Sequence, residues 1–144
     1  MSRVVDRFLR YIKIDTASSE NADSFPSTDK QFYLARLLAK ELRELGAQDV
    51  YLDDKYCYVY ATIPASSGRE KDKVTGFIAH MDTSPETSGT DVKPRIINDY
   101  DGKDISLGDS GLVLSTKNFP ELKRYMGLNL IVTSGDTLLG GDDK

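Results

Sequence analysis

A histidine and an aspartate separated by one residue, His80 and Asp82, are the first candidates for chemistry in this chain. In an extended segment, residues two apart project from the same side. A carboxylate placed there can accept the proton of one imidazole nitrogen, which leaves the other nitrogen as a lone pair for a metal ion. Metal-binding histidines generally have such a partner. The spacing therefore indicates a metal ligand, His80, and a residue that orients it, Asp82.

A second candidate lies much later, where Gly140 and Gly141 precede Asp142 and Asp143. Glycines let the backbone approach a ligand closely, and adjacent carboxylates present oxygen ligands for a metal. Each motif alone also has a simpler interpretation. His80 is equally well explained as an imidazole satisfied by a backbone carbonyl, and the two aspartates are better explained as a solvated acidic turn.

The position of His80 depends on the segment that contains it. Residues 73–83 carry an apolar run between charged residues and Ser84-Pro85, which predicts a buried strand that ends near His80. In open α/β sheets, ligands bind in the crevice beyond the carboxyl ends of the strands. Residues 15–21 are polar and rich in turn formers, so we expect a loop that is mobile unless a ligand or another part of the protein holds it.

Two amphipathic helices are predicted early in the chain. Apolar residues at helical spacing favour a helix over residues 2–14 and a second one from Thr28, a candidate N-cap, to Leu45 before Gly46. The charged side chains of the second helix are expected to form a solvated face. They are Lys30, Arg36, Lys40, Glu41, Arg43 and Glu44.

A β-hairpin is predicted next, from strands over residues 49–52 and 56–63. Tyrosines alternate with small apolar residues in the second strand, so one face of the hairpin is aromatic, and we expect a helix to cover it. Cys57 belongs to the apolar side and is expected to be a buried, inert thiol. Further short strands are predicted over residues 95–97, 105–107 and 128–134, with a short helix over 119–126.

Composition narrows the classes of function. The 144 residues suffice for one domain with a real core, and a net charge of -4 without a basic block argues against nucleic acid as a partner. The single cysteine excludes an intrachain disulfide, and Met1 to Asp6 carry no signal peptide, which favours the cytoplasm. No apolar run approaches the roughly 20 residues that cross a bilayer, so no membrane is expected as a partner.

Taken together, the two motifs identify a family. His80-Met81-Asp82-Thr83 after an apolar run, followed by Thr137 to Lys144 with its Gly-Gly-Asp-Asp sequence, resembles the peptidase T family. These are tripeptide aminopeptidases of the dinuclear zinc aminoacylase and carboxypeptidase superfamily. Other landmarks agree in order: Asp15 to Ser18, Asp104 to Gly108, and Val113 to Ser115. The resemblance covers essentially the whole chain.

The resemblance implies a role for each matching residue. His80 would bind one zinc ion, Asp82 would hold its imidazole, and Asp142 would bridge two zinc ions. The Asp142-Asp143 peptide bond would be cis, which costs on the order of 3 kcal/mol and is expected only where function holds it. Gly141 stands where family members commonly have Ala, a departure that should not alter ligation. Zinc would supply the nucleophile, since it lowers the pKa of bound water to roughly 7.

The resemblance also implies residues that this sequence does not contain. A Glu-Glu pair with the general base, a further Asp, a further His and a lid domain are expected, whereas His80 is the only histidine here. We therefore expect residues 1–144 to be an N-terminal part of the catalytic domain, a three-layer α/β/α fold with an incomplete mixed sheet. Alone, this part is expected neither to hydrolyse peptides nor to bind two zinc ions tightly, and its open sheet edge should favour self-association.

Two alternatives to a tripeptide aminopeptidase remain open from the sequence. One is another dinuclear zinc enzyme of the same superfamily, such as a dipeptidase, an acylase or a carboxypeptidase, because the His-x-Asp motif and the Asp pair are common to all of them. The other is a non-catalytic α/β interaction module that has lost its metals. In the enzyme interpretation the substrate is a small peptide, and its length is set by residues outside this sequence.

Overall fold

The computed structural model describes residues 3–139. They form two compact units, one from residues 3–13 and 86–139 and the other from residues 14–85. Both contain short helices and strands, so the chain is a mixed α/β protein. The described strands pair in three two-stranded antiparallel sheets, and the predicted three-layer architecture with a mixed sheet stays a prediction. The Gly-Gly-Asp-Asp motif with Asp142 lies outside the described residues.

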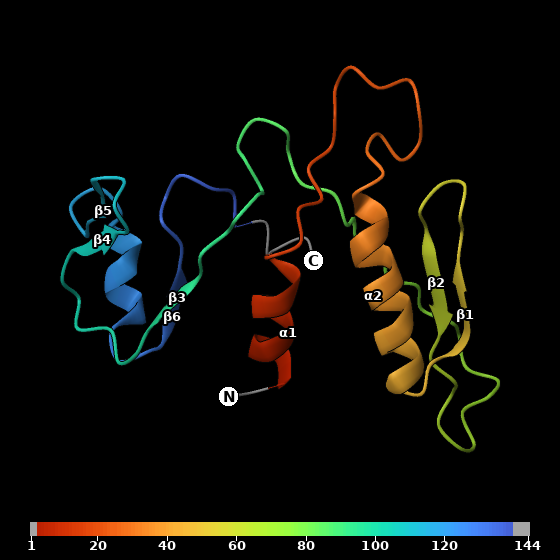
Figure 1. Ribbon diagram of the computed structural model, residues 1–144. Helices are drawn as coiled ribbons and strands as arrows, with labels where there is room; N and C mark the ends of the chain where they lie inside the picture. Colours follow the sequence, from red (N-terminus) through yellow and green to blue (C-terminus); the bar gives the residue numbers. More distant parts are fainter. Residues whose placement is uncertain (1–2, 140–144) are drawn as a thin grey trace. The chain divides into compact units, whose positions relative to one another are not determined.

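One helix and one hairpin build the unit of residues 14–85. Helix α2 (Gln31–Glu44) packs against strands β1 (Gln48–Leu52) and β2 (Val59–Thr62), which are antiparallel (Figure 1). Leu34 and Ala35, both 0% exposed, lie at the centre of the buried helix face. The predicted helix and hairpin are confirmed. The expectation of a fully solvated charged face is wrong at Glu41, which is only 7% exposed.

The start of α2 differs from the prediction. Thr28 does not cap the helix, because the N-cap position is Lys30 and no side chain bonds to the helix there. A tight turn precedes α2 instead, in which the backbone N–H of Gln31 donates to the Thr28 carbonyl oxygen at 3.3 Å. The Thr28 hydroxyl is thereby available to another element, the loop of residues 15–18.

The hairpin turn explains why β2 begins later than predicted. Asp53 Oδ1 accepts the backbone N–H groups of Lys55 and Tyr56 at 2.8 and 2.9 Å, which closes a side-chain turn. Cys57 then has a φ of 60° and cannot continue a strand. Its side chain is 3% exposed, so the prediction of a buried thiol is confirmed.

The tyrosines of the hairpin are exposed, so the expectation that a helix covers them is wrong. The four rings form a ladder: Tyr51 stacks on Tyr60 and Tyr56 on Tyr58, and Tyr58 meets Tyr60 edge-on, with centroids 6.2 to 6.3 Å apart. Their exposures range from 42% for Tyr56 to 58% for Tyr51. Helix α2 packs on both strands, and on the small apolar face Cys57 is buried and Val59 half-buried, whereas Ala61 is exposed. The helix side of the hairpin is therefore the side of Cys57.

The buried strand predicted over residues 73–83 is also wrong. The backbone of residues 73–82 has no regular structure, and Val74, Phe77 and Ile78 are 97%, 95% and 102% exposed. A strand needs neighbours to pair its backbone groups, and in the described part of the chain β1 and β2 pair only with each other. Without a partner strand the run stays in water despite its apolar sequence.

The unit of residues 3–13 and 86–139 combines helix α1 (Arg3–Tyr11) with small sheets. Strand β3 (Arg95–Ile97) pairs with β6 (Leu130–Val132), and β4 (Ile105–Leu107) with β5 (Leu112–Leu114); the 3-10 helix η1 spans Pro120–Tyr125. These elements were predicted except β5. Their core consists of Tyr100, Ile105, Leu122 and Val132.

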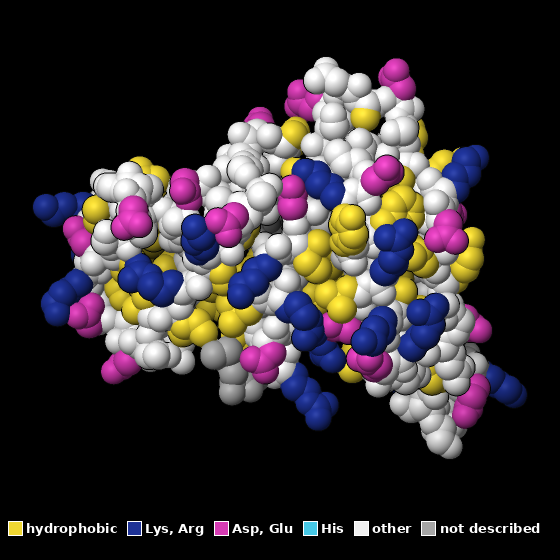
Figure 2. All heavy atoms as spheres, viewed as in Figure 1, with side chains coloured by type: hydrophobic (Ala, Val, Ile, Leu, Met, Phe, Trp, Pro, Cys, Tyr) yellow, Lys and Arg dark blue, Asp and Glu magenta, His cyan; other side chains and the backbone are white. Residues whose placement is uncertain are grey.

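Charged side chains of both signs are interspersed on the surface in Figure 2. This distribution agrees with the net charge of -4 and with the absence of a basic block in the sequence. Within residues 3–139, no helix has both the length and the apolar character needed to span a membrane.

Candidate functional site

His80 and Asp82 meet in the structure. Asp82 Oδ1 lies 3.0 Å from Nδ1 of His80, and the backbone oxygen of Asp82 lies 3.0 Å from the same nitrogen. Both neighbours are acceptors, so they favour the tautomer with a proton on Nδ1, in which Nε2 carries the lone pair. The two side chains are 59% and 41% exposed. An imidazole held in this way suits a zinc ion, which prefers nitrogen ligands with such a partner.

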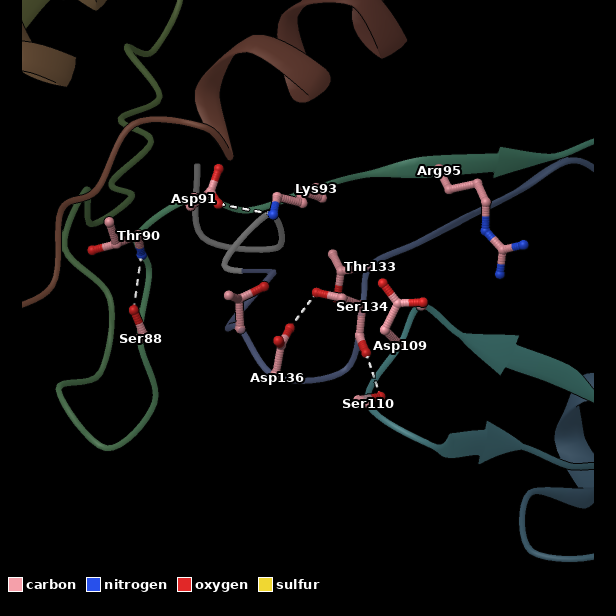
Figure 3. Close-up of a pocket in the computed structure, with 12 residues that line it drawn as sticks. Ser88, Thr90, Asp91, Lys93, Arg95, Asp109, Ser110, Thr133, Ser134 and Asp136 are labelled. Atoms are coloured by element: carbon pink, nitrogen blue, oxygen red, sulfur yellow. Dashed lines mark hydrogen bonds and ion pairs between the residues drawn. The ribbon is translucent and has the colours of Figure 1, made fainter.

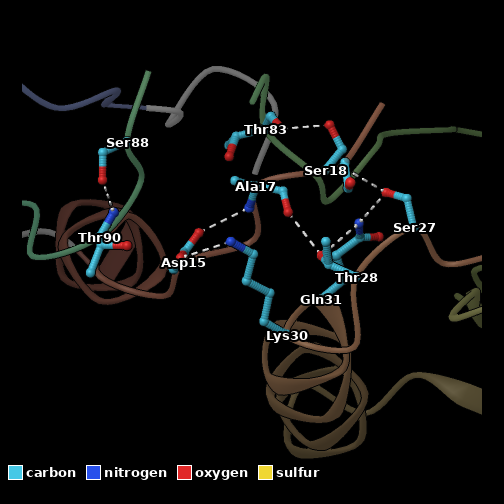
Figure 4. A network of polar contacts seen from close by, with 11 residues as sticks. Asp15, Ala17, Ser18, Ser27, Thr28, Lys30, Gln31, Thr83, Ser88 and Thr90 are labelled. Carbon is cyan, nitrogen blue, oxygen red and sulfur yellow. Dashed lines mark hydrogen bonds and ion pairs between the residues drawn. The ribbon is translucent and has the colours of Figure 1, made fainter. Parts of the chain in front are cut away.

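The loop of residues 15–18 anchors the next residue, Thr83. Ala17 and Thr83 form a parallel bridge, in which the Thr83 N–H donates to the Thr16 carbonyl oxygen at 3.2 Å. The Thr83 carbonyl oxygen accepts two bonds from Ser18, one from its N–H at 2.9 Å and one from its hydroxyl at 3.0 Å (Figure 4). The loop expected to be mobile is therefore held by this chain itself.

The same loop is tied to the start of α2. The Thr28 hydroxyl donates to the Ala17 carbonyl oxygen at 2.8 Å, and Lys30 Nζ lies 2.9 Å from Asp15 Oδ2 (Figure 4). Asp15 Oδ1 also accepts the N–H of Ala17 at 3.0 Å. A continuous set of polar contacts thus runs from the helix through the loop to Thr83, which adjoins Asp82.

A complete metal centre is not present in residues 3–139, where no three His, Cys, Asp or Glu side chains are grouped to hold one ion. Of the predicted ligands, the described part contains His80, with Asp82 in contact with its Nδ1. Asp142 lies outside the described residues, so its meeting with His80 at a common ion stays a prediction.

A polar pocket of about 590 Å³ lies in the other unit, and sequence reasoning did not find it. Its lining includes Lys93, Arg95 and the carboxylates of Asp91, Asp109 and Asp136 (Figure 3). These residues come from irregular segments and strand ends, and no spacing rule joins them. Neither His80 nor Asp82 lines it.

The charges of this pocket largely compensate each other. Asp91 lies 3.0 Å from Lys93 Nζ, and its hydrogen bond and charge raise the pKa of Lys93, with smaller contributions from Asp136 and Asp109. The Ser134 hydroxyl bonds to Asp136 and lowers the pKa of that carboxyl. Lys93, Asp91 and Asp136 thus already have partners, so none of these three groups is poised as an acid, base or nucleophile.

Comparison with known proteins supports the resemblance found in the sequence. The chain is 56% identical over 145 aligned positions to peptidase T of Halothermothrix orenii and 55% identical to peptidase T of Caldanaerobacter subterraneus subsp. tengcongensis, with 100% of the chain covered in both cases. Peptidase T of Geobacillus kaustophilus is 49% identical over 142 positions, or 98% of the chain. No family model matches the chain.

These matches extend along the whole sequence, so the predicted resemblance to the peptidase T family is confirmed. They also show that the chain is short beside its relatives. It spans 34 to 35% of the length of the three curated relatives named above.

Proposed function

We propose that this chain supplies the first part of the catalytic domain of a zinc aminopeptidase of the peptidase T type, which releases the N-terminal residue from tripeptides in the cytoplasm. The contact between His80 Nδ1 and Asp82 Oδ1, at 3.0 Å, carries the proposal. This contact favours the tautomer in which Nε2 carries the lone pair, as a metal ligand requires, and the motif lies within the region of 56% identity to a protein named peptidase T. Both observations support the proposal.

The residues of this chain would share the work as follows. His80 Nε2 binds a zinc ion, and Asp82 fixes the imidazole and stabilises the positive charge that ligation induces. Asp142 would supply a carboxylate ligand to the same zinc centre, and the remaining ligands and the lid of the three-layer domain would come from further residues. Zinc, when bound, supplies an acidified water for attack on the peptide bond.

The comparison of full-length protein with the His80→Gln variant tests this function. Full-length protein is expected to contain zinc and to release the first residue of a tripeptide, whereas His80→Gln loses both. Asp101→Asn, which changes an exposed carboxylate paired with Lys103, is the control and should retain both. Zinc content and turnover in His80→Gln equal to those of the control would refute the proposal.

A second experiment addresses the part of the site that this chain contains. Residues 1–144 alone are expected to show no turnover, because His80 and Asp142 cannot hold a dinuclear centre by themselves. Peptide release that rises with the concentration of the purified 144-residue chain, free of full-length enzyme, would contradict that expectation.

A further inference from the structure

His80 and Asp82 lie at the end of an exposed segment without regular structure, so their position depends on contacts of the neighbouring residues. Residues 71–80 are exposed, whereas Thr83 is only 3% exposed and Ala17 only 9%. The change from exposed to buried backbone therefore takes place within three residues of His80, at the bridge between Ala17 and Thr83.

Both backbone polar groups of Thr83 are used in that bridge. Its N–H donates to the Thr16 oxygen, and its oxygen accepts the N–H and the hydroxyl of Ser18 at 2.9 and 3.0 Å. The threonine side chains contribute nothing to the connection: the hydroxyls of Thr16 and Thr83 are buried and have no hydrogen-bond partner in the described part of the chain. The hydroxyl of Ser18 is thus the side-chain group of this bridge that bonds to Thr83.

The loop that forms the other side of the bridge is itself held by residues next to α2. The Thr28 hydroxyl holds the Ala17 oxygen at 2.8 Å, and the Lys30–Asp15 ion pair, at 2.9 Å, fixes the start of the loop. Thr28 and Lys30 immediately precede α2, whose buried face anchors them to the core of the unit. Through these contacts, the packed helix α2 fixes the position of the loop, and the loop fixes the position of Thr83.

We infer that Ser18 is a positioning residue for the proposed metal site: its hydroxyl, bonded to the Thr83 oxygen, fixes Asp82 so that both Asp82 acceptors face His80 Nδ1. The inference rests on the proposed function, because the site that Ser18 positions is the proposed metal site. The hydrogen bonds that carry it form without a metal ion. Since both acceptors belong to the residue next to Thr83, a shift of Thr83 moves them together. Metal ligands lose affinity when their supporting contacts loosen.

The single histidine of the 144-residue chain makes the test direct. Ring-nitrogen NMR of metal-free protein reports the tautomer of His80 with no overlap from other imidazoles. The Nδ1–H form is expected to dominate in the unmodified chain. In Ser18→Ala its ratio to the Nε2–H form should fall about fivefold, the order that one neutral hydrogen bond contributes to an equilibrium. Ser18→Thr, which keeps the hydroxyl, should restore it.

Ser24→Ala is the matched control, because the Ser24 hydroxyl donates to the Pro26 oxygen at 3.2 Å in an exposed part of the same region. Thr28→Val is a second route to the same effect, since it removes the hydroxyl that holds Ala17 and keeps the side-chain shape. If Ser18→Ala fails to fold, the tautomer ratio of Thr28→Val serves as the test. Tautomer ratios in Ser18→Ala and Thr28→Val that equal those of Ser24→Ala would overturn the role of Ser18.

Titration with zinc sulfate, followed through the His80 Nε2 signal, separates this inference from the proposed function. If the proposed function holds, zinc moves the signal, and Ser18→Ala weakens the apparent affinity about fivefold. If zinc leaves the signal of the unmodified chain and of full-length protein unchanged, the proposed function fails. The tautomer comparison still decides whether Ser18 positions His80.

Discussion

Removal of the Asp82 side chain tests how much its carboxylate, which orients His80, contributes to zinc affinity. Nδ1 of His80 has two acceptors at 3.0 Å, and only one of them, Oδ1, is a side-chain atom. In Asp82→Ala the backbone oxygen still favours the Nδ1–H tautomer. Loss of such a supporting group typically weakens metal binding 10- to 100-fold. We therefore expect an effect at the lower end, about 10-fold.

The charge of Asp82 accounts for only part of this effect. The His80 and Asp82 side chains are 59% and 41% exposed, so solvent screens their attraction. Exposed charge pairs contribute about 0.2 to 1 kcal/mol, or roughly 1.5- to 5-fold in affinity. Asp82→Asn, which keeps an oxygen acceptor without the charge, should therefore lose less than Asp82→Ala.

Calorimetric titration of metal-free full-length protein with zinc measures both effects, with Asp101→Ala as the exposed-carboxylate control. We expect the zinc affinity to decrease in the order unmodified protein, Asp82→Asn, Asp82→Ala. An affinity of Asp82→Ala equal to that of the control would show that Asp82 does not support the ligand. A loss much above 100-fold would show that the backbone oxygen does not compensate.

Three further predictions concern parts of the chain away from the metal site. Cys57 should react slowly with a thiol reagent at neutral pH, because burial raises its pKa and reduces the thiolate fraction; denaturant should accelerate the reaction, and equal rates in both conditions would refute the buried geometry. Leu34→Ala should destabilise its unit by about 2 to 5 kcal/mol in a denaturant titration, while Leu45→Ala, at a 57% exposed position, should cost far less. The 144-residue chain should self-associate through the exposed Phe77 and Ile78, and Phe77→Asp should reduce this in light scattering; a monomer at all concentrations would exclude it.

The sequence predicted well those elements that are stabilised by neighbours close in the chain. Helix α2 and the β1–β2 hairpin pack against each other within residues 31–62, so apolar spacing and the turn at Asp53 determine them. The contact of His80 with Asp82 is local in the same sense, because two residues of chain bring the groups together. In these cases, residue spacing and contacts between residues close in the chain are sufficient to predict the structure.

The failures share the opposite cause. The apolar run at Val74 to Ile78 has the composition of a buried strand, but composition does not provide a neighbour, and no described strand pairs with it. A helix was expected to cover the tyrosine face of the hairpin, because aromatic side chains have a large area to bury. In the structure, α2 packs on the side of Cys57 instead. Which face is covered depends on tertiary contacts that alternation alone does not specify.

The loop of residues 15–18 shows how a site can depend on residues that no motif contains. Its polar composition predicted a loop that is mobile unless a ligand or another part of the protein holds it. In the structure Thr28, the predicted helix cap, donates to the loop instead, and Ser18 donates to Thr83. If Ser18 has the role we infer, the geometry of the His80–Asp82 pair depends on a hydroxyl donor from a loop much earlier in the chain. A motif then identifies the reacting groups, while their geometry is set by hydrogen bonds that only the folded backbone reveals.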